Sequence, residues 1–397
     1  MAYLQSNLIP RYNWDYGVAD LLRAFGAAIG VVPAHGERLG QLFDTRPIHT
    51  GSGRASLYAI LKGLRLEKGS HIGVPLYCCP VVFDAIRQAG MIPEFIDVDL
   101  ESFNLSAHDL VRKIEDISAV VVVHMFGHPA DMDAIAKVTS NSIPVIEDCA
   151  QALFSRYKGV YTGLLSDVSF FSFRSGKYLS AGEGSSIFCK GSDLHSDISS
   201  IVENFNDRAL IREFLNAITI YIKSKCYQKP LYGLVGLPIG KRLDRRMNLT
   251  AKSGFELEKA AKINLGVVDA KLVNFINSIE RQRQNALYYK ANIHTEKIRL
   301  PEEKPDCWSN YYQFPIRFSS REARDRAANY LFDKGIDCAK YLDEVVELAT
   351  EQYGYRGDCP QSECCAATML SIPNYYRLSS KDRDRIVVAL NEIEHII

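Results

Sequence analysis

The sequence lacks a net charge, a long apolar run and a secretory leader pattern, and each absence narrows the possible functions. Among its 397 residues, 47 are basic and 47 are acidic, so the whole chain offers no general attraction for nucleic acid. No uncharged apolar run approaches the roughly eighteen residues that a membrane-spanning helix needs. The first residues also lack a basic start, an apolar core and a cleavage site. We therefore expect a cytoplasmic protein without a nucleic-acid partner.

Cysteines are few for the length of the chain. Ten are scattered through 397 residues, too sparsely for a disulfide scaffold, so we expect reduced thiols. Cys359, Cys364 and Cys365 form one cluster, but it lacks paired C-x-x-C spacing and has no nearby histidine. The sequence therefore predicts no metal site. It also contains no internal repeat and no low-complexity segment.

Short apolar runs alternate with helical patterns between residues 52 and 190. Predicted strands cover residues 71–78, 92–99, 117–126, 143–149 and 168–173, with helical spacing at 54–64, 80–90 and 131–140. This alternation predicts an α/β fold, a mostly parallel sheet with helices on both faces. We assign this large domain to residues 1–248.

The remaining residues, 249–397, predict a linking helix followed by a smaller α+β domain. A long helical pattern covers 256–289, a strand candidate covers 311–319 and a helix covers 321–335. The last predicted helix begins at Ser379, which has the S-x-x-D spacing of a capping box with Asp382.

Residues 200–248 interrupt the strand and helix alternation and resemble an inserted arm. A helical pattern places six apolar residues along one face: Leu210, Ile211, Phe214, Ile218, Tyr221 and Ile222. Seven basic residues and one acidic residue then surround the apolar run 230–240. The pattern favours packing of the arm on a partner subunit. The alternatives are peripheral contact of residues 209–246 with an anionic membrane, or binding of a diphosphate.

An acidic residue, a lysine and a glycine-rich helix start are the main candidates for catalytic or ligand-binding residues. Asp148 ends a predicted buried strand, where open parallel sheets bind ligands. Lys177 follows the next strand, 29 residues later, and Ser172 precedes it by five. Gly53 and Arg54 open a helix whose free N–H groups suit a phosphate.

These residue types match the needs of pyridoxal phosphate. Its aldehyde needs a lysine for a Schiff base, its pyridine nitrogen needs an aspartate, and its phosphate needs N–H and hydroxyl donors. The alternative is structural, because a single lysine after a strand is usually a surface residue on a turn. In that interpretation Asp148 and Gln151 cap a helix, Ser172 is a satisfied strand hydroxyl, and Gly53 and Arg54 form an ordinary turn.

Six motifs occur in a fixed order along the chain: SGRASL, VPLYCC, DVD, VHMFGHPADM, IEDCAQ and SFRSGKYLSAGEG. Together they resemble the DegT/DnrJ/EryC1/StrS family of sugar-nucleotide aminotransferases, which are fold type I enzymes dependent on pyridoxal phosphate. The resemblance covers nearly the whole chain. It implies that Lys177 is the catalytic Schiff-base lysine, that Asp148 holds the pyridine nitrogen and that Gln151 lies near the ring hydroxyl. The phosphate would be held by Ser172, Gly53 and Arg54.

Three positions depart from the family pattern or are ambiguous. Where the family often has an aromatic residue stacked on the cofactor ring, this chain has Cys79, so either Tyr77 or Cys79 would contact the ring. Asn248 is a loose match to an asparagine that reaches a neighbouring subunit's phosphate. His124 belongs to the pattern and is either a substrate contact or a hydrogen-bonded structural histidine.

The resemblance also implies a reaction and an assembly. An amino group would pass from glutamate or glutamine to a keto-sugar, most plausibly nucleotide-linked, for cell-surface polysaccharide or amino-sugar biosynthesis. A homodimer with shared active sites is implied as well. Other pyridoxal phosphate chemistry on a non-sugar ketone, or a non-catalytic relative that keeps the fold, are the alternative hypotheses.

Overall fold

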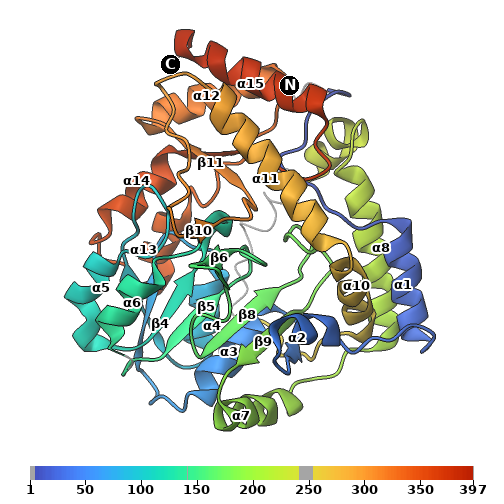
Figure 1. The fold of residues 1–397 in the computed structure, drawn as a ribbon, viewed down its shortest axis with the longest axis vertical. Coiled ribbons are helices and arrows are strands. Elements are labelled where there is room, and N and C mark those ends of the chain that lie inside the picture. The colour runs from blue at the N-terminus through green and yellow to red at the C-terminus, as the bar shows by residue number, and fades with distance from the viewer. Residues whose placement is uncertain (1–4, 141, 241–253, 397) are drawn as a thin grey trace.

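A seven-stranded sheet forms the centre of the computed structural model, which describes residues 5–140, 142–240 and 254–396 (Figure 1). The strand order is β1-β9-β8-β5-β4-β2-β3. Five strands lie within the predicted runs: β2 (His71–Pro75), β3 (Ile92–Ile96), β4 (Ile117–Val123), β5 (Val145–Asp148) and β8 (Val168–Ser172). β9 (Ser185–Cys189) runs antiparallel to both neighbours, β8 and β1 (Ile48–Thr50), while the other pairs are parallel. The α/β prediction is confirmed, with β1 and β9 added.

Helices cover both faces of the sheet, and β4 shows why its sequence is almost entirely apolar. Val121 packs in the cluster that contains α3 and α4, whereas Val120 and Val122 pack in the cluster that contains α5 and α6. Alternate side chains of a strand point to opposite faces, so a strand covered on both sides must be apolar throughout. The helices on these faces are α3 (Gly53–Gly63), α4 (Val81–Gln88), α5 (Ala107–Lys113), α6 (Met132–Thr139) and α7 (Ser192–Glu203).

The predicted alternation of strand and helix fails between β5 and β8. A small antiparallel sheet of β6 (Arg156–Tyr157), β7 (Val160–Tyr161) and β10 (Cys307–Trp308) occupies that position in place of a helix. Another core cluster lies at the β9 end of the central sheet, where Phe171 and Phe188 meet α1 (Val18–Ala28), α2 (Glu37–Phe43) and α10 (Lys262–Leu272).

The C-terminal residues form their own core around the pair β11 (Phe314–Arg317) and β12 (Met369–Ile372). The helices of this core are α11 (Phe275–Asn292), α12 (Arg321–Asp333) and α15 (Ser380–Glu392). The buried residues of α13 (Val345–Tyr353) and α14 (Pro360–Thr368) pack instead in the large core that contains α3 and α4. Ser379 caps α15 as expected, because its hydroxyl accepts the Asp382 N–H at 3.1 Å. Ile9 also packs in the C-terminal core, so the N-terminal segment crosses to it. The predicted boundary at residue 248 lies outside the described residues and stays a prediction.

Two predicted helical segments differ from expectation. The long pattern 256–289 forms two helices, α10 and α11, which are separated at residues 273–274. The arm forms α8 (Leu210–Cys226), but α8 buries Ala217, Ile220 and Ser224, whereas most of the predicted apolar face is exposed. Short helical turns complete the assignment: η1 (Ile114–Asp116), η2 (Met125–Gly127), the π-helical η3 (Tyr232–Gly236) and η4 (Ile393–His395). Among the described helices, none is long and apolar enough to cross a membrane.

Candidate active site

Asp148 is fixed at the carboxyl end of β5, in the middle of the sheet. It pairs with Val123 of β4 and with Phe170 of β8, and only 6% of its surface is exposed. One carboxylate oxygen accepts the Ala150 N–H at 2.9 Å. Burial raises the pKa of Asp148, and the nearby Lys177 cation opposes that increase. A carboxylate in this position favours a cationic partner.

Lys177 lies in the turn that follows β8, and its positive charge acts on the Asp148 carboxylate. Its backbone N–H donates to the Arg174 carbonyl at 2.9 Å, and Gly176 supplies the left-handed φ of 89° that the turn requires. The Lys177 ammonium lies 5.8 Å from the Tyr312 ring centroid and has no hydrogen-bond partner among the described residues. Burial lowers the pKa of Lys177, while Cys79 and Asp148 partly oppose this shift. A lower pKa increases the neutral, nucleophilic fraction of the amine.

The start of α3 lies directly over the end of β8. A Cβ atom added to Gly53 would lie 3.4 Å from the Phe170 ring and 3.6 Å from Cβ of Ser172. Ser52 caps the helix by accepting the Ala55 N–H at 3.2 Å, so the N–H groups of Gly53 and Arg54 remain available as anion donors. The structure therefore brings the predicted phosphate residues Gly53 and Ser172 together.

The side chain and the backbone of Arg54 have different surroundings. Its guanidinium lies over the Phe255 ring at 4.9 Å, so the side chain is engaged in a cation–π contact. The N–H group of Arg54 still belongs to the first turn of α3. Asn248, the loosely matched phosphate residue, lies outside the described residues.

The side chains of Gln151 and Tyr77 both contact Tyr341, which belongs to the C-terminal part of the chain. The Gln151 side chain accepts the Phe126 N–H at 3.0 Å and donates to the Tyr341 hydroxyl at 3.3 Å. Tyr77 is fully buried and donates to the Tyr341 carbonyl at 2.9 Å, so its ring belongs to the core. Cys79 is half-buried and close enough to Lys177 to influence its pKa. Of the two candidates for contact with the cofactor ring, Cys79 is the more accessible.

His124 uses both ring nitrogens within the protein. Nδ1 accepts the Ala130 N–H at 3.0 Å, so Nε2 carries the proton and donates to Glu147 at 3.0 Å. The ring is fully buried. This geometry fits the structural alternative that the sequence left open, because neither nitrogen is available to a substrate.

A possible ligand cluster surrounds the same histidine. Ligand atoms of His124, Glu147 and Cys149 lie within 4.8 Å of one another, and all three residues are buried. Glu147 already accepts N–H groups from Gly163 at 2.7 Å and from Ser166 at 2.7 Å. Its oxygens are thus occupied by hydrogen bonds, and the cluster is explained by packing without an ion.

The N-terminal segment contributes residues that the sequence did not indicate. A Cβ atom added to Gly176 would lie 3.3 Å from Trp14 Nε1, so this indole lies against the turn that carries Lys177. Trp14 also stacks on Tyr227 at the end of α8, with 4.7 Å between ring centroids. Tyr312 donates to the Gly176 carbonyl at 2.5 Å from the opposite part of the chain. Contacts across such sequence distances leave no local pattern that could have predicted them.

An ion-pair network fixes the glycine-rich turn at residues 182–184. Arg208 pairs with Glu183 and, at 2.5 Å, with Glu258. The Gly51 N–H donates to the Glu258 carbonyl at 2.7 Å, and the Gly184 N–H donates to the Gly51 carbonyl at 3.1 Å. The turn after the lysine and the segment before α3 are therefore held together.

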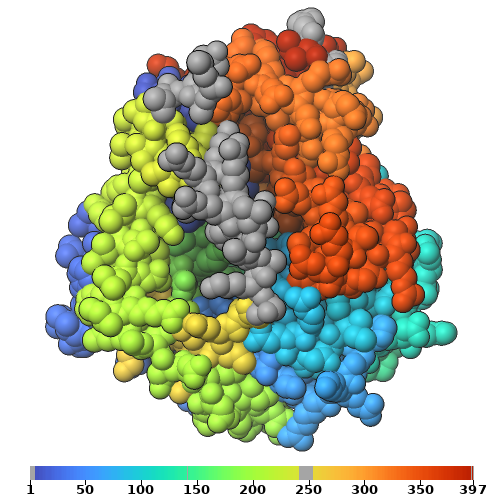
Figure 2. Space-filling model, turned by 180° about the vertical axis from the view of Figure 1, so that it is seen from behind, coloured from blue at the N-terminus to red at the C-terminus, as the bar shows by residue number. Residues whose placement is uncertain are grey.

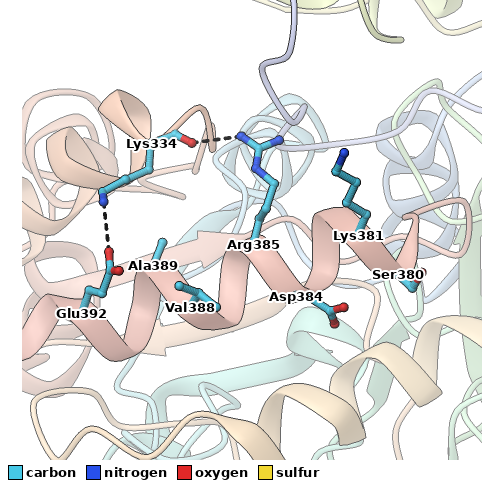
Figure 3. A pocket seen from close by; sticks show the side chains of 8 residues that line it. All are labelled: Lys334, Ser380, Lys381, Asp384, Arg385, Val388, Ala389 and Glu392. Atoms are coloured by element: carbon cyan, nitrogen blue, oxygen red, sulfur yellow. Dashed lines mark hydrogen bonds and ion pairs between the residues drawn. The ribbon is translucent and has the colours of Figure 1, made fainter.

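A separate hollow of about 550 Å³ lies along the outer side of α15 (Figure 3). Two contacts join residues that line it: Lys334 binds Glu392 at 3.0 Å, and Arg385 donates to the Lys334 carbonyl at 3.0 Å. None of the predicted cofactor residues lines it. The region around Lys177 is therefore the candidate active site, because Asp148, Ser172 and the start of α3 lie around it.

A mostly parallel seven-stranded sheet with helices on both faces, followed by a smaller C-terminal unit, is the architecture of fold type I pyridoxal phosphate enzymes. The model of the DegT/DnrJ/EryC1/StrS aminotransferase family matches residues 43–391. The chain belongs to this family and is a pyridoxal-phosphate-dependent aminotransferase.

Individual relatives agree with this assignment. The chain is 27% identical to GDP-perosamine synthase of Escherichia coli O157:H7 over 348 residues, which cover 86% of this chain and 84% of that protein. It is 24% identical to a UDP-N-acetyl-3-dehydro-alpha-D-glucosamine 3-aminotransferase of Acidithiobacillus ferrooxidans, over 87% of this chain and 83% of that protein. The fold matches the aminotransferase TlmJ from Streptoalloteichus hindustanus with a TM-score of 0.79 at 19% identity, over 98% of this chain and 99% of that one.

Proposed function

We propose that this enzyme transfers an amino group from glutamate or glutamine to a nucleotide-linked keto-sugar in amino-sugar or cell-surface polysaccharide biosynthesis. The observation that carries the proposal is the position of Lys177, with its lowered pKa, next to the buried carboxylate of Asp148 in a chain of this family. The names of two relatives that match over most of the chain, one a GDP-sugar synthase and the other an aminotransferase of a UDP-sugar, support this substrate class.

The residues around Lys177 fit pyridoxal phosphate. When bound, the cofactor withdraws electrons from the carbon whose proton is to be moved. Lys177 would bind the cofactor covalently and, once released, its amine would accept and return that proton. The Asp148 carboxylate would keep the pyridine nitrogen protonated. Gln151 would orient the ring from the side of Tyr341.

The opposite end of the cofactor would lie at the start of α3. The N–H groups of Gly53 and Arg54 and the hydroxyl of Ser172 would bind its phosphate. These donors come from the helix start and from the end of β8, which meet in the structure. Cys79 would contact the ring as a soft, polarisable group.

The lysine assignment is tested by covalent capture. The protein is loaded with pyridoxal phosphate, reduced with borohydride, digested and analysed by mass spectrometry. We expect the modification on Lys177, and its loss together with the visible absorption band in Lys177→Ala. Lys190→Ala, which changes an exposed lysine just after β9, is the control and should keep both signals. Equal labelling of Lys177→Ala and the wild type would overturn the assignment.

The substrate class is tested with a panel of ketones. Nucleotide-linked keto-sugars, keto-cyclitols and simple 2-keto acids are supplied with glutamate or glutamine, and the aminated products are identified by mass spectrometry. A cyclic non-sugar ketone is the second candidate, because the chain is 32% identical over 149 residues to an L-glutamine:2-deoxy-scyllo-inosose aminotransferase of Streptomyces fradiae. That match covers 37% of this chain and 35% of that protein. Turnover of cyclitols alone would contradict the sugar proposal.

We also propose a cytoplasmic homodimer whose active sites are shared between subunits. Family resemblance supports the dimer, and the ten free cysteines support a reducing compartment. Asn248 of one subunit would serve the phosphate site of the other. Mixed dimers of inactive Lys177→Ala and Asn248→Ala should then regain activity, because one site of each mixed dimer is intact. Light scattering that gives a monomer, or mixtures without rescue, would contradict the shared site.

A further inference from the structure

The side chain of Gln151 is held at both ends, just beyond the end of β5. Its Oε1 accepts the Phe126 N–H at 3.0 Å, so its Nε2 is the end that donates to the Tyr341 hydroxyl at 3.3 Å. The Tyr341 ring packs edge-on against the Phe126 ring, with 5.5 Å between the ring centroids. The Tyr341 hydroxyl is therefore fixed in position, by a hydrogen bond to its oxygen and by the packing of its ring.

Three tyrosines of this region differ in what their hydroxyl protons bind. Tyr77 donates to the Tyr341 carbonyl at 2.9 Å, and Tyr312 donates to the Gly176 carbonyl at 2.5 Å. Tyr341 is half-buried and accepts a hydrogen bond from Gln151, and its own proton has no acceptor within the described residues. A tyrosine hydroxyl is both a donor and an acceptor, so Tyr341 keeps a donor for a ligand.

The Tyr341 hydroxyl stays protonated at neutral pH. Burial raises the pKa of Tyr341 well above its ordinary value of 10, and Cys79 raises that pKa further. Cys79 also acts on Lys177, whose ammonium lies 5.8 Å from the Tyr312 ring centroid. The Tyr341 hydroxyl and the Lys177 amine therefore border the same region, and the hydroxyl acts there as a donor.

The segment that carries Tyr341 is anchored to the large core, although it belongs to the C-terminal part of the chain. Tyr341 and Leu342 pack against that core. The segment leads into α13, where the Tyr353 hydroxyl donates to Asp84 of α4 at 2.6 Å. In Figure 2 the orange-red atoms of this part of the chain lie against the blue atoms of the residues that include α4. Tyr341 thus has a fixed place relative to the central sheet.

The order of the strands places the Tyr341 hydroxyl on one particular side of Asp148. β5, which ends at Asp148, lies between β8 and β4. The start of α3 lies over Ser172 at the end of β8. Phe126, which contacts both Gln151 and Tyr341, follows β4. The proposed phosphate donors therefore lie on the β8 side of the carboxylate, and the Tyr341 hydroxyl lies on the β4 side.

The substituents of pyridoxal phosphate are arranged in the same order. Its ring nitrogen lies opposite the carbon that carries the aldehyde, and the phosphate arm and the phenolic oxygen occupy the two ring carbons beside that carbon. Three anchors are proposed above: the nitrogen at Asp148, the aldehyde carbon at Lys177 and the phosphate at the start of α3. With these anchors, the phenolic oxygen faces the β4 side, where Gln151 and Tyr341 lie.

The inference rests on the proposed function and adds a residue to its site. We propose that the Tyr341 hydroxyl donates a hydrogen bond to the phenolic oxygen of bound pyridoxal phosphate, while Gln151 holds Tyr341 in place. Such a donor stabilises negative charge on the oxygen. The proton that this oxygen shares with the Schiff-base nitrogen of Lys177 is then lost more easily, so the pKa of the bound cofactor is lower than it would be without the donor.

The test is a pH titration of the visible absorption band of the full-length protein loaded with pyridoxal phosphate. The variant is Tyr341→Phe, which removes the hydroxyl and keeps the ring against Phe126. The matched control is Tyr289→Phe, which removes a buried hydroxyl that donates to the Pro373 carbonyl at 2.8 Å in the C-terminal core. Borohydride trapping on Lys177 reports whether each protein assembles the site.

We expect the pKa of the band transition to be higher by about 1 in Tyr341→Phe than in the wild type and in Tyr289→Phe. A second measurement compares the affinity for pyridoxal phosphate with the affinity for its 3-deoxy analogue, which lacks the phenolic oxygen. Tyr341→Phe should bind pyridoxal phosphate about tenfold more weakly than the wild type does, and it should bind the analogue as tightly as the wild type does.

The outcomes separate this inference from the proposed function. A wild type that forms no adduct on Lys177 would overturn the proposed function and the role of Tyr341 with it. An adduct in both proteins with an unchanged pKa would leave the proposed function in place and overturn the role of Tyr341. An equal loss of affinity for pyridoxal phosphate and for the analogue would also overturn that role, because Tyr341 would then only support the structure of the site.

Discussion

Replacing Glu147 with glutamine is expected to destabilise the large core beneath the active site. Glu147 precedes Asp148 on β5, so its side chain points to the opposite face of the sheet. It is fully buried, and its two carboxylate oxygens accept five hydrogen bonds. The donors are His124 Nε2 at 3.0 Å, the N–H groups of Gly163, Leu165 and Ser166 at 2.7, 2.9 and 2.7 Å, and the Ser166 hydroxyl at 3.0 Å.

The magnitude follows from counting the donors that lose an acceptor. In Glu147→Gln, the amide NH₂ must face either the two donors at one oxygen or the three at the other. At least two buried donors, Gly163 N–H and His124 Nε2–H, are then left unsatisfied, at about 1–3 kcal/mol each. His124 cannot move its proton to relieve this, because its Nδ1 already accepts the Ala130 N–H. We expect a loss of about 4 kcal/mol in the free energy of unfolding.

The assay is urea unfolding at pH 7, with Glu94→Gln as the control. Glu94 is half-buried, and among the described residues its carboxylate bonds only to His71, so its replacement should cost less than about 1 kcal/mol. A Glu147→Gln protein whose free energy of unfolding lies within that range of the wild-type value would refute the reasoning, because the five hydrogen bonds to Glu147 would then not depend on one another.

The pH dependence gives a second check on the same change. Burial raises the pKa of Glu147, but hydrogen bonds from His124 and the backbone outweigh it, so the net shift is below the ordinary value of 4.5. The ionised side chain therefore contributes stability that is present above pH 4.5 and is lost as the pH falls through the lowered pKa. The difference between wild type and variant should shrink over that acidic range. A difference that grows on acidification would contradict the assignment of charge to Glu147.

Three further changes test the residues around the site. Asp148→Asn should lower the pKa of Lys177, because the carboxylate opposes the effect of burial. The pH dependence of Lys177 acetylation in cofactor-free protein measures that pKa, and an unchanged profile would contradict the prediction. Trp14→Ala should reduce kcat/KM roughly tenfold or more, whereas Trp14→Phe, which keeps a ring against Tyr227, should retain most of the wild-type kcat/KM. An equal loss of kcat/KM in both variants would argue against a role for the stacking. His128→Asn should flatten the fall in stability between pH 6.5 and 4. Burial lowers the pKa of His128 to about 4, so the folded protein resists the proton that the unfolded chain accepts. An unaltered slope of stability against pH would contradict this.

The strands of the parallel sheet were predictable because their burial leaves a simple signal. β4 is covered on both faces, so its run from Ala119 to Val123 is entirely apolar and could be recognised without the structure. Asp148 ends β5 and Lys177 lies in the turn after β8, so both positions also follow from the predicted strands. Local sequence thus predicted both the sheet and the two residues at its edge.

β9 was missed for a physical reason. It begins with Ser185 and Ser186, which are typical of a loop, yet both are buried in the sheet. The Ser185 hydroxyl bonds to Ser56 at 2.7 Å, and the Ser186 hydroxyl bonds to His49 at 2.8 Å. A buried hydroxyl is stable only when it has such partners, and these partners come from distant parts of the chain. Local polarity alone could not reveal them.

The placement of Asp148 and Lys177 on different kinds of structure suits the different roles proposed for them. In that proposal Asp148 would hold one position, and it lies on a central strand that Glu147 anchors to the opposite face. In the proposed mechanism Lys177 would bind the cofactor, release it and then move a proton, so it would change partners during one turnover. It lies in a turn that bends at Gly176, where Trp14 and Tyr312 contact the backbone beside it and leave its ammonium free of hydrogen bonds among the described residues. A lysine on the strand itself would have a fixed direction, whereas a lysine on a supported turn can move while its carboxylate partner stays in place.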